Sequence, residues 1–388
     1  KDAKQSLIDS KKDILKPVRK VERHLYDKKR QSTFEAIFGN KIETHSIESK
    51  AFVLLKTELL KIDYNRKITI LTWPIEHELL EIESYQDWWV CEKLLKRKRI
   101  VIRVIGSKQV GMGHIYRTLS LVHDITDHEI LFVSDKENEV AVNRLADIDY
   151  WLGIFEVGKV VENIIKLKPD LVINDILSTK KSDILPLKEH GIKVVNFEDL
   201  GPGALIADLT INDLYEEPQF NGRNILWGHK YFFLRDEFND AKKHKFETRV
   251  KAILLTFGGT DQLNLSSIIY HAIRDICKQR NIIINIVTGY GYEGYEELET
   301  DVENEDYVTL TKSTGIISSI MEQSQIAITS NGRTVYELAH MNIPAIVISQ
   351  HEREETHKFA RSEYGFIPIN TFKQGKSEVM VVNELSKL

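Results

Sequence analysis

The feature that most constrains this chain is an alternation of short β-branched apolar runs with longer amphipathic stretches, beginning at Arg99. Such apolar runs are typical of strands buried on both faces, and their alternation with helices predicts parallel sheets. The alternation occurs twice, before and after a charged segment at 240–249. The predicted strands are Ile100–Ile105, Glu129–Val133, Leu171–Ile173 and Ile192–Phe197, then Ala252–Thr256, Ile282–Val287, Ile326–Thr329 and Ala345–Ile348. We therefore expect an α/β fold with two Rossmann-like domains, 99–239 and 240–388.

Length and composition narrow the function classes. At 388 residues the chain suits two or three domains, each with its own core. The net charge of -5 argues against a general nucleic-acid or membrane surface. No secretory leader and no apolar run of about 18 residues occurs, so no membrane span is expected. Cys91 and Cys277 lie in helical or apolar contexts, which favours reduced thiols, a cytoplasmic protein and small-molecule partners.

A glycine loop at 106–113 follows the first predicted strand, and a helix begins behind it with His114. Glycines let the backbone approach a ligand and a helix N-terminus attracts anions, which predicts a sugar-phosphate site; the alternative is a tight turn. The helix dipole favours a neutral imidazole, which suits a general base. We predict His114 as catalytic and Gly111, Gly113 and Arg117 as substrate-binding. The third glycine of a GxGxxG dinucleotide fingerprint is missing, so neither NAD nor another cofactor is expected.

Two polar loops follow strands of the second series. Paired glycines with a nearby hydroxyl at Gly258–Asp261 suit a diphosphate, a plain turn being the alternative. Ser330–Thr334 repeats this arrangement and precedes Glu337, a candidate acceptor for ribose hydroxyls. The alternative there is a surface ion pair between Arg333 and Glu337 at i,i+4 spacing. The predicted nucleotide-binding residues are Gly258, Gly259, Thr260, Asp261, Asn331, Gly332, Thr334 and Glu337.

Other polar residues stand at predicted strand ends. Asp175, Glu198 and Asp199 follow strands of the first domain, where carboxylates either line a site or cap a helix. We predict Asp175 as substrate-binding. The residues His351, Glu354 and His357 follow the last strand of the second series, and we favour an exposed helix start over the cleft for them. No His, Cys and Asp arrangement has metal-ligand spacing, and no GxSxG or P-loop occurs, so no metal is expected.

Residues 1–98 differ from the rest of the chain. Charged, helical-looking segments surround short apolar runs such as Ile68–Leu71. Tyr85–Leu95 has helical spacing of its apolar residues and leads into the basic run Lys96–Arg99. A solvated helix end explains that run better than a binding patch. We expect a terminal amphipathic helix and a short linker.

Four motifs in the same order resemble a known family. They are GMGHIYR at Gly111–Arg117, FFLRDEF at Phe232–Phe238, GGTDQLNLS at Gly258–Ser266 and SNGRTVYEL at Ser330–Leu338. Together they look like the UDP-sugar hydrolases of nonulosonic acid biosynthesis, relatives of family-28 glycosyltransferases with the GT-B fold of two domains facing across a cleft. The resemblance covers about residues 100–370. It implies that His114 is catalytic and that both later loops bind the nucleotide diphosphate.

The resemblance also implies a reaction: water attacks the anomeric carbon of a UDP-linked 2,4-diacetamido-2,4,6-trideoxy sugar, without a metal. Family members often have Asp-x-Tyr after the middle strand, whereas this chain has Asp175, Ile176 and Leu177. The sugar contacts there, and the exact sugar, therefore stay open. Two rivals also stay open: a glycosyltransferase that passes the sugar to an acceptor, and a non-catalytic nucleotide-sugar binding module. No strong apolar or basic patch on the first domain stands out, which tilts modestly toward hydrolysis.

The first 98 residues resemble the C-terminal part of a CMP-sialic-acid-type cytidylyltransferase. The resembling motifs are RHLYDKK at Arg23–Lys29, the pair Arg30–Gln31, LLKTELL at Leu54–Leu60 and LLEIESYQDWWVCEKLL at Leu79–Leu95. The chain opens at Lys1, and the nucleotide-binding half of such an enzyme is absent. We expect a fusion protein cut within its first domain, with no cytidylyltransferase activity. Enzymes of this type usually dimerise, so a homodimer is one expectation.

Overall fold

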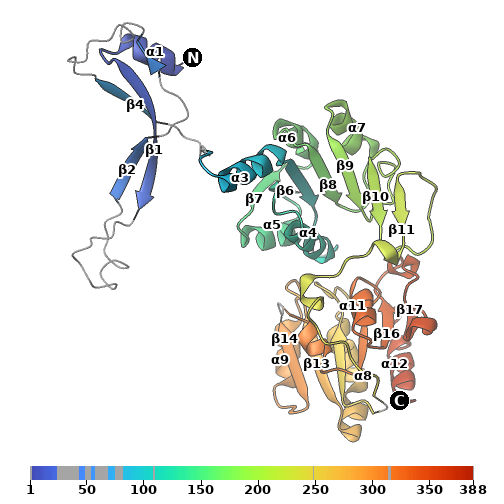
Figure 1. Ribbon diagram of the computed structural model, residues 1–388. Helices are drawn as coiled ribbons and strands as arrows, with labels where there is room; N and C mark the ends of the chain where they lie inside the picture. The colour runs from blue at the N-terminus through green and yellow to red at the C-terminus, as the bar shows by residue number, and fades with distance from the viewer. Residues whose placement is uncertain are drawn as a thin grey trace, which may run out of the picture. The chain divides into compact units, whose positions relative to one another are not determined.

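The computed structural model describes residues 2–23, 43–48, 54–56, 69–74, 82–107, 110–247, 249–312 and 316–387. The chain divides into two compact units, Lys1–Lys96 and Arg97–Leu388 (Figure 1). Within the described ranges, no helix is both long and apolar enough to cross a membrane. Most of the cytidylyltransferase-like motifs before Leu80, and Gln109 of the first glycine loop, lie outside these ranges.

The first unit contains a small mixed sheet around one long strand. β1 (Ile14–Arg23) pairs antiparallel with β2 (Glu43–Glu48) and β3 (Leu54–Leu55), and parallel with β4 (Ile70–Pro74). α1 (Asp2–Asp9) precedes the sheet, and the expected amphipathic helix is α3 (Tyr85–Lys96), which has no buried residue. This sheet does not establish a cytidylyltransferase origin, which stays a prediction.

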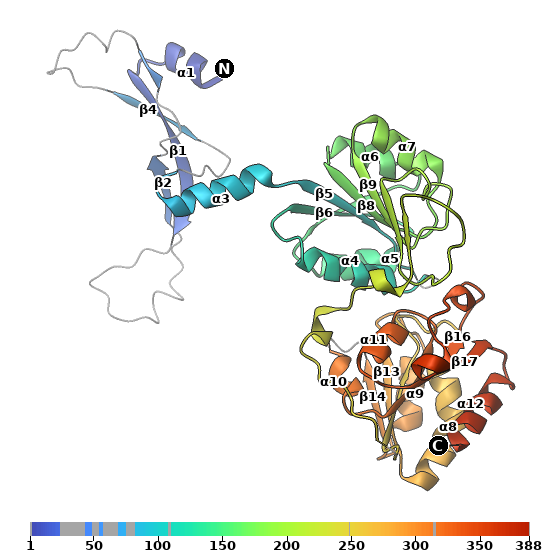
Figure 2. The ribbon, with the colours of Figure 1, turned by 45° about the vertical axis from the view of Figure 1, so that its right-hand side comes forward.

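The first lobe of the second unit is a seven-stranded parallel sheet with strand order β11-β10-β9-β8-β5-β6-β7. Its strands are β5 (Arg99–Val104), β6 (Glu129–Asp135), β7 (Trp151–Phe155), β8 (Leu171–Asp175), β9 (Lys193–Phe197), β10 (Leu209–Asn212) and β11 (Ile225–Trp227). Its helices are α4 (Gly113–His123), α5 (Glu139–Ala146), α6 (Val160–Lys166) and α7 (Lys181–Glu189). The first pair of helices covers one face of the sheet and the second pair covers the other (Figure 2).

The second lobe is a six-stranded parallel sheet with strand order β14-β13-β12-β15-β16-β17. Its strands are β12 (Ala252–Thr256), β13 (Ile283–Thr288), β14 (Val308–Lys312), β15 (Ile326–Ser330), β16 (Ala345–Ser349) and β17 (Phe366–Thr371). Its helices are α8 (Leu265–Arg280), α9 (Tyr295–Val302), α10 (Ser318–Met321), α11 (Thr334–His340) and α12 (Ser377–Ser386). Short 3-10 turns, η2 (His229–Tyr231) and η3 (Asp236–Phe238), lie between the two sheets in sequence.

Both sheets have the Rossmann strand order, with the first strand in the middle and the order reversing beside it. The reversal lies between β5 and β8 in the first lobe and between β12 and β15 in the second. In such sheets ligands bind outside the carboxyl ends of the strands at this point. The α/β fold class is therefore confirmed, and the topology assigns one ligand-binding edge to each lobe.

The central strands form because both of their faces find helices. In β5, Ile100 and Ile102 pack with α4 and α5, whereas Val101 packs with α6 and α7. In β12, Ile253 belongs to the cluster with α8 and Leu254 to the cluster with α11. A strand covered on both sides reads as a continuous apolar run, which is why these strands were predictable.

The strands that sequence reasoning missed are β7, β10, β11, β14 and β17. β7, β11, β14 and β17 are the edge strands of their sheets, and β10 is only four residues long. In β14 no side chain is fully buried, and β7 buries only Gly153. Their apolar runs are short or interrupted, as in the three residues of β11 and the alternating Val308–Lys312 of β14, so these runs were not recognised as strands.

Candidate active site

The first glycine loop carries the chain from β5 into α4. Gly111 has a left-handed backbone with φ of 80°, and its N–H donates to Ser107 O at 2.8 Å, which folds the loop back before the helix. Glycine adopts this conformation without the Cβ penalty of other residues. His114, the second residue of α4, is 5% exposed and lines a cavity, as do Gly111 and Gly113. The predicted catalytic histidine therefore lies at the ligand-binding edge of the first sheet.

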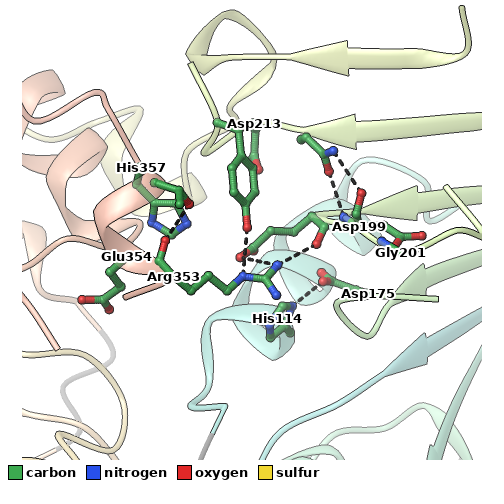
Figure 3. A network of polar contacts seen from close by, with 12 residues as sticks. His114, Asp175, Asp199, Gly201, Asp213, Arg353, Glu354 and His357 are labelled. Carbon is green, nitrogen blue, oxygen red and sulfur yellow. Dashed lines mark hydrogen bonds and ion pairs between the residues drawn. The ribbon is translucent and has the colours of Figure 1, made fainter. Parts of the chain in front are cut away.

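His114 forms a buried dyad with Asp175, the last residue of β8. The distance between His114 Nδ1 and Asp175 Oδ1 is 2.5 Å (Figure 3). Burial by itself would raise the pKa of Asp175, but Arg117 and His114 hold it well below its ordinary value. An ionised carboxylate only accepts hydrogen bonds, so Nδ1 must be the donor. In the neutral ring this leaves the Nε2 lone pair available to take a proton.

Arg117 binds the other side of the dyad. Its Nε donates to Asp175 Oδ2 at 2.7 Å and its Nη2 donates to Asp175 Oδ1 at 2.5 Å. The guanidinium also contacts Asp213 at 3.3 Å and Glu198 at 3.0 Å. Burial works against this cation, but the three carboxylates raise the pKa of Arg117 well above its ordinary value. Arg117 lines the cavity, yet its bonds are to protein groups, so we assign it to positioning.

Asp175 also has a positioning role, because its bonds are to protein groups. We predicted a substrate-binding role, but Asp175 is fully buried and does not line the cavity. Both of its oxygens are already bound to Arg117 and His114. This arrangement orients the imidazole and engages both carboxylate oxygens with protein groups. The helix-cap alternative also fails, because the Asp175 oxygens bind the side chains of His114 and Arg117 and not the backbone N–H groups of a helix start.

The second glycine loop follows β12 and faces the first one. Gly258 has φ of 85°, and Gly258, Gly259 and Thr260 line the cavity. A Cβ at Gly259 would come within 2.8 Å of Met112 Cβ, and one at Gly111 within 3.7 Å of Thr260 Oγ1. Loops from the two lobes therefore approach each other at positions where only glycine fits easily.

Asp261 has a different function from its three neighbours. Its two carboxylate oxygens accept the N–H groups of Leu265 at 2.8 Å and Ser266 at 2.7 Å, at the start of α8. It does not line the cavity. The structure therefore shows Asp261 closing the helix start, which shapes the loop, whereas the sequence predicted nucleotide contact.

The loop after β15 supplies a further part of the cavity wall. Gly332, Arg333, Thr334 and Glu337 line the cavity, whereas Asn331 does not. Asn331 Nδ2 instead donates to the backbone oxygens of Glu354 at 2.7 Å and His357 at 3.1 Å. Three of the four residues predicted in this part of the chain therefore face the same space, together with Arg333, and Asn331 fixes the neighbouring loop.

The surface ion pair between Arg333 and Glu337 is not formed. Arg333 Nη1 donates to Asp213 Oδ2 of the first lobe at 2.8 Å. Glu337 Oε1 accepts from Arg235 Nε at 3.0 Å. Arg333 therefore pairs with the first lobe, and Glu337 pairs with the segment between the two sheets, beside the cavity.

The cavity has a volume of about 690 Å³ and is lined from both lobes. The first lobe contributes the His114 loop and Glu198, and the second contributes all three loops that follow β12, β15 and β16. A volume of this size lies in the range of small-molecule and cofactor sites. Within the described residues, no group of three or more His, Cys, Asp or Glu side chains is arranged to hold a metal ion.

The loop after β16 corrects one prediction. We favoured exposure for His351, Glu354 and His357, and only His351 is exposed. Glu354 and His357 are buried, and all three line the cavity. Glu354 Oε2 accepts the N–H of Gln350 at 2.7 Å, and His357 Nδ1 donates to Asn331 O at 2.8 Å. The loop folds inward because Asn331 binds its backbone, a long-range contact that local sequence does not reveal.

The buried Glu354 predicts a pH effect on stability. Burial is the main cause that raises its pKa from 4.5 to about 7. Between these values the unfolded chain loses its proton first, so ionisation favours unfolding as the pH rises. Glu354→Gln keeps an acceptor oxygen and removes this cost. The variant should be more stable than the wild type by roughly 2 kcal/mol at about pH 8, and equally stable at about pH 4.

Urea unfolding at both pH values measures this difference. Glu352→Gln is the matched control, because Glu352 is an exposed carboxylate two residues away. The control should show no pH-dependent gain. An equal gain in stability for both variants, or no gain for Glu354→Gln, would contradict the raised pKa of Glu354.

Sequence reasoning missed several cavity residues. Arg235 and Phe233 lie in the FFLRDEF motif, which we noted only as part of a resemblance. Arg353 lies between two residues that we had noted, and it donates to Tyr215 Oη at 2.9 Å. The position of the FFLRDEF motif between the other motifs could have indicated Arg235. No local pattern indicated Arg353, because its partners are in the other lobe.

Comparisons with known proteins agree with this geometry. Residues 253–361 match the glycosyltransferase family 28 C-terminal domain. An uncharacterized protein of Methanocaldococcus jannaschii is 28% identical over 71% of this chain and 61% of its own length. The chain thus spans less than two thirds of that relative. The spore coat polysaccharide biosynthesis protein SpsG of Bacillus subtilis is 24% identical, over 64% of this chain and 76% of its own.

Two further matches are a UDP-sugar hydrolase and a solved structure. The UDP-2,4-diacetamido-2,4,6-trideoxy-beta-L-altropyranose hydrolase of Campylobacter jejuni is 23% identical, over 69% of this chain and 97% of its own. The crystal structure of Acinetobacter baumannii MurG has 14% identity and a TM-score of 0.49, and covers 75% of this chain and 90% of that one. The chain thus has two Rossmann-like lobes, the second of which matches the family 28 C-terminal domain over residues 253–361, and it is similar to proteins named for a UDP-sugar hydrolase and for polysaccharide biosynthesis.

Proposed function

We propose that this protein is a nucleotide-sugar hydrolase that releases UDP from a UDP-linked 2,4-diacetamido-2,4,6-trideoxy sugar or a related UDP-amino sugar. One observation carries the proposal. The His114–Asp175 dyad borders the same cavity as the glycine loops of the second lobe. A base oriented by a carboxylate, beside loops suited to a diphosphate, is the arrangement that attack by water on a nucleotide sugar requires.

The second lobe would hold the nucleotide and the first lobe would supply the base. The diphosphate would lie against Gly258, Gly259 and Thr260, with Gly332 and Thr334 beside it. Glu337 remains the candidate for a ribose hydroxyl, although one of its oxygens already binds Arg235. The backbone N–H groups of these loops would stabilise the charge that develops on the departing diphosphate.

His114 would activate the water. Its Nδ1–H is held by Asp175, so Nε2 is the atom that takes the proton. As the water oxygen bonds to the anomeric carbon, the bond to the diphosphate oxygen breaks and its electron pair leaves with UDP. The products are free sugar, UDP and a proton. The name of the Campylobacter jejuni relative supports this sugar class for the substrate.

Sugar transfer is the second candidate, because the second lobe matches a glycosyltransferase domain. In that case the same base would deprotonate an acceptor hydroxyl instead of water. The fold hosts both chemistries, so it does not choose between them. A non-catalytic binding module is the third candidate; the buried dyad beside the cavity is not needed for binding alone.

Incubation with a panel of UDP-sugars distinguishes the three. We expect equal amounts of UDP and free sugar without any acceptor, most rapidly from UDP-linked diacetamido-trideoxy sugars. UDP and sugar are followed by chromatography with and without candidate acceptors. Release that needs an acceptor identifies a transferase, and UDP affinity without release identifies a binding module.

A further inference from the structure

Glu198 is a carboxylate in the cavity that the proposed step leaves unused. It follows β9, lines the cavity and has a left-handed backbone with φ of 53°. That conformation is strained for a residue other than glycine, and such strain gathers at functional sites. The sequence pattern gave Glu198 and Asp199 the same two possible roles, lining a site or capping a helix. The structure separates them, because only Glu198 lines the cavity.

Asp199 holds the turn that places Glu198. It is fully buried, and its oxygens accept from Thr179 N at 2.9 Å, Gly201 N at 2.7 Å and Asn196 Nδ2 at 2.6 Å (Figure 3). Its own N–H donates to Asn212 Oδ1 at 2.8 Å. The strained backbone of Glu198 is therefore imposed by a rigid, fully bonded neighbour.

The Glu198 carboxylate lies next to the dyad. Its Oε2 is 3.0 Å from Arg117 Nη2, the same nitrogen that donates to Asp175 Oδ1 and lies 3.1 Å from His114 Nδ1. Its Oε1 is 3.8 Å from Arg353 Nη2, too far for a hydrogen bond. A carboxylate offers about four lone-pair positions, so among the described contacts acceptor capacity remains for a ligand.

Glu198 is negatively charged at neutral pH. Burial acts to raise its pKa, but Arg117 and the neighbouring cations lower it to about 2. Asp175 and Asp213 are fully buried and enclosed by protein partners. Of the three carboxylates around Arg117, Glu198 alone lines the cavity.

We propose that Glu198 is a further catalytic residue, whose carboxylate stabilises the positive charge that develops on the anomeric carbon and ring oxygen of the sugar. This inference rests on the proposed function. The bond from the anomeric carbon to the diphosphate oxygen breaks with its electron pair, and the bond to the water oxygen forms. The proton of the water goes to His114 Nε2. Glu198 gains and loses no atoms; it lowers the energy of the charged transition state.

Three variants test this role in the full chain. Glu198→Gln removes the charge at nearly constant shape, and Glu198→Asp keeps the charge and tolerates a left-handed backbone. Glu216→Gln is the matched control, because Glu216 is a first-lobe carboxylate that binds His229 and does not line the cavity. We measure kcat and KM for UDP release, UDP affinity and the melting temperature.

Loss of the charge should lower kcat about 100-fold in Glu198→Gln, with KM and UDP affinity within about threefold of the wild type. Glu198→Asp should keep more activity than Glu198→Gln, and the control should match the wild type. Equal loss in both Glu198 variants, or a loss only in KM or melting temperature, would show a structural or binding role and overturn the inference. A wild type that cleaves no UDP-sugar overturns the proposed function as well, whereas an active wild type with an unimpaired Glu198→Gln overturns the inference alone.

Discussion

His114→Ala is expected to lower kcat for UDP release by about a thousandfold and to leave UDP affinity nearly unchanged. The imidazole is the only group of the dyad that lines the cavity, so its removal takes away the proton acceptor. The glycine loops that we propose for the nucleotide belong to the second lobe and keep their own contacts. Steady-state kinetics give kcat, and calorimetric titration with UDP gives the affinity.

A second histidine on the same helix provides the control. His123 is the last residue of α4, and its side chain is 60% exposed and paired with Asp236. His123→Ala should stay within about twofold of the wild type, since surface substitutions of this kind disturb little. Unchanged turnover in His114→Ala would exclude the base. A parallel loss of UDP affinity would instead assign His114 to binding.

Arg117→Met is expected to lower the free energy of unfolding by about 3–5 kcal/mol. The guanidinium is fully buried and binds Asp175 and Asp213, which are also fully buried. Its removal takes the shared counter-charge from both buried carboxylates, although Asp175 keeps its bond to His114 and Asp213 keeps its bond to Arg333. The cost comes from the reduced compensation of these buried charges rather than from the lost contact itself. Urea unfolding at neutral pH measures the change.

The deficit of the same variant should shrink on acidification. Asp175 and Glu198 have folded-state pKa values below their unfolded values of 3.8 and 4.5. They therefore stabilise the wild-type fold above about pH 4, and this contribution is lost as the pH falls toward the folded values. Arg117 causes much of this lowering, so the variant lacks the contribution already at neutral pH, and its stability should approach that of the wild type in acid. Arg99→Met is the control, because Arg99 forms a half-exposed pair with Glu129; a loss there as large as that of Arg117→Met would refute the burial argument.

Local patterns were sufficient for the central architecture. The strands β5, β8, β12 and β15 lie within one or two residues of the predicted runs, because each is covered by helices on both faces. The glycine loops after β5 and β12 also follow from local rules, because a left-handed backbone, as at Gly111 and Gly258, favours glycine at that position. Solvent-facing edge strands such as β14 lack this pattern and were missed.

Residue roles within the site were harder to predict than its position. Asp175, Asp261 and Asn331 stood in the correct loops, but each bonds to protein groups and supports a neighbour. A carboxylate at a strand end looks the same in sequence whether it binds a ligand, a histidine or a helix start. The partner decides among these, and the partner of Asp175 lies 61 residues away at His114.

By itself, the sequence determined two parallel α/β lobes and the loops at which ligands would bind. Hydrophobic periodicity and the placement of glycines depend on neighbours along the chain, so strands and loops can be predicted from them without the structure. The tertiary structure alone decided the contacts that define the site: the His114–Asp175 dyad, the Arg333–Asp213 pair between lobes, and the entry of Glu198 and Glu354 into one cavity. These contacts join residues far apart in the chain, because burial and charge pairing depend on which surfaces meet after the sheets have formed.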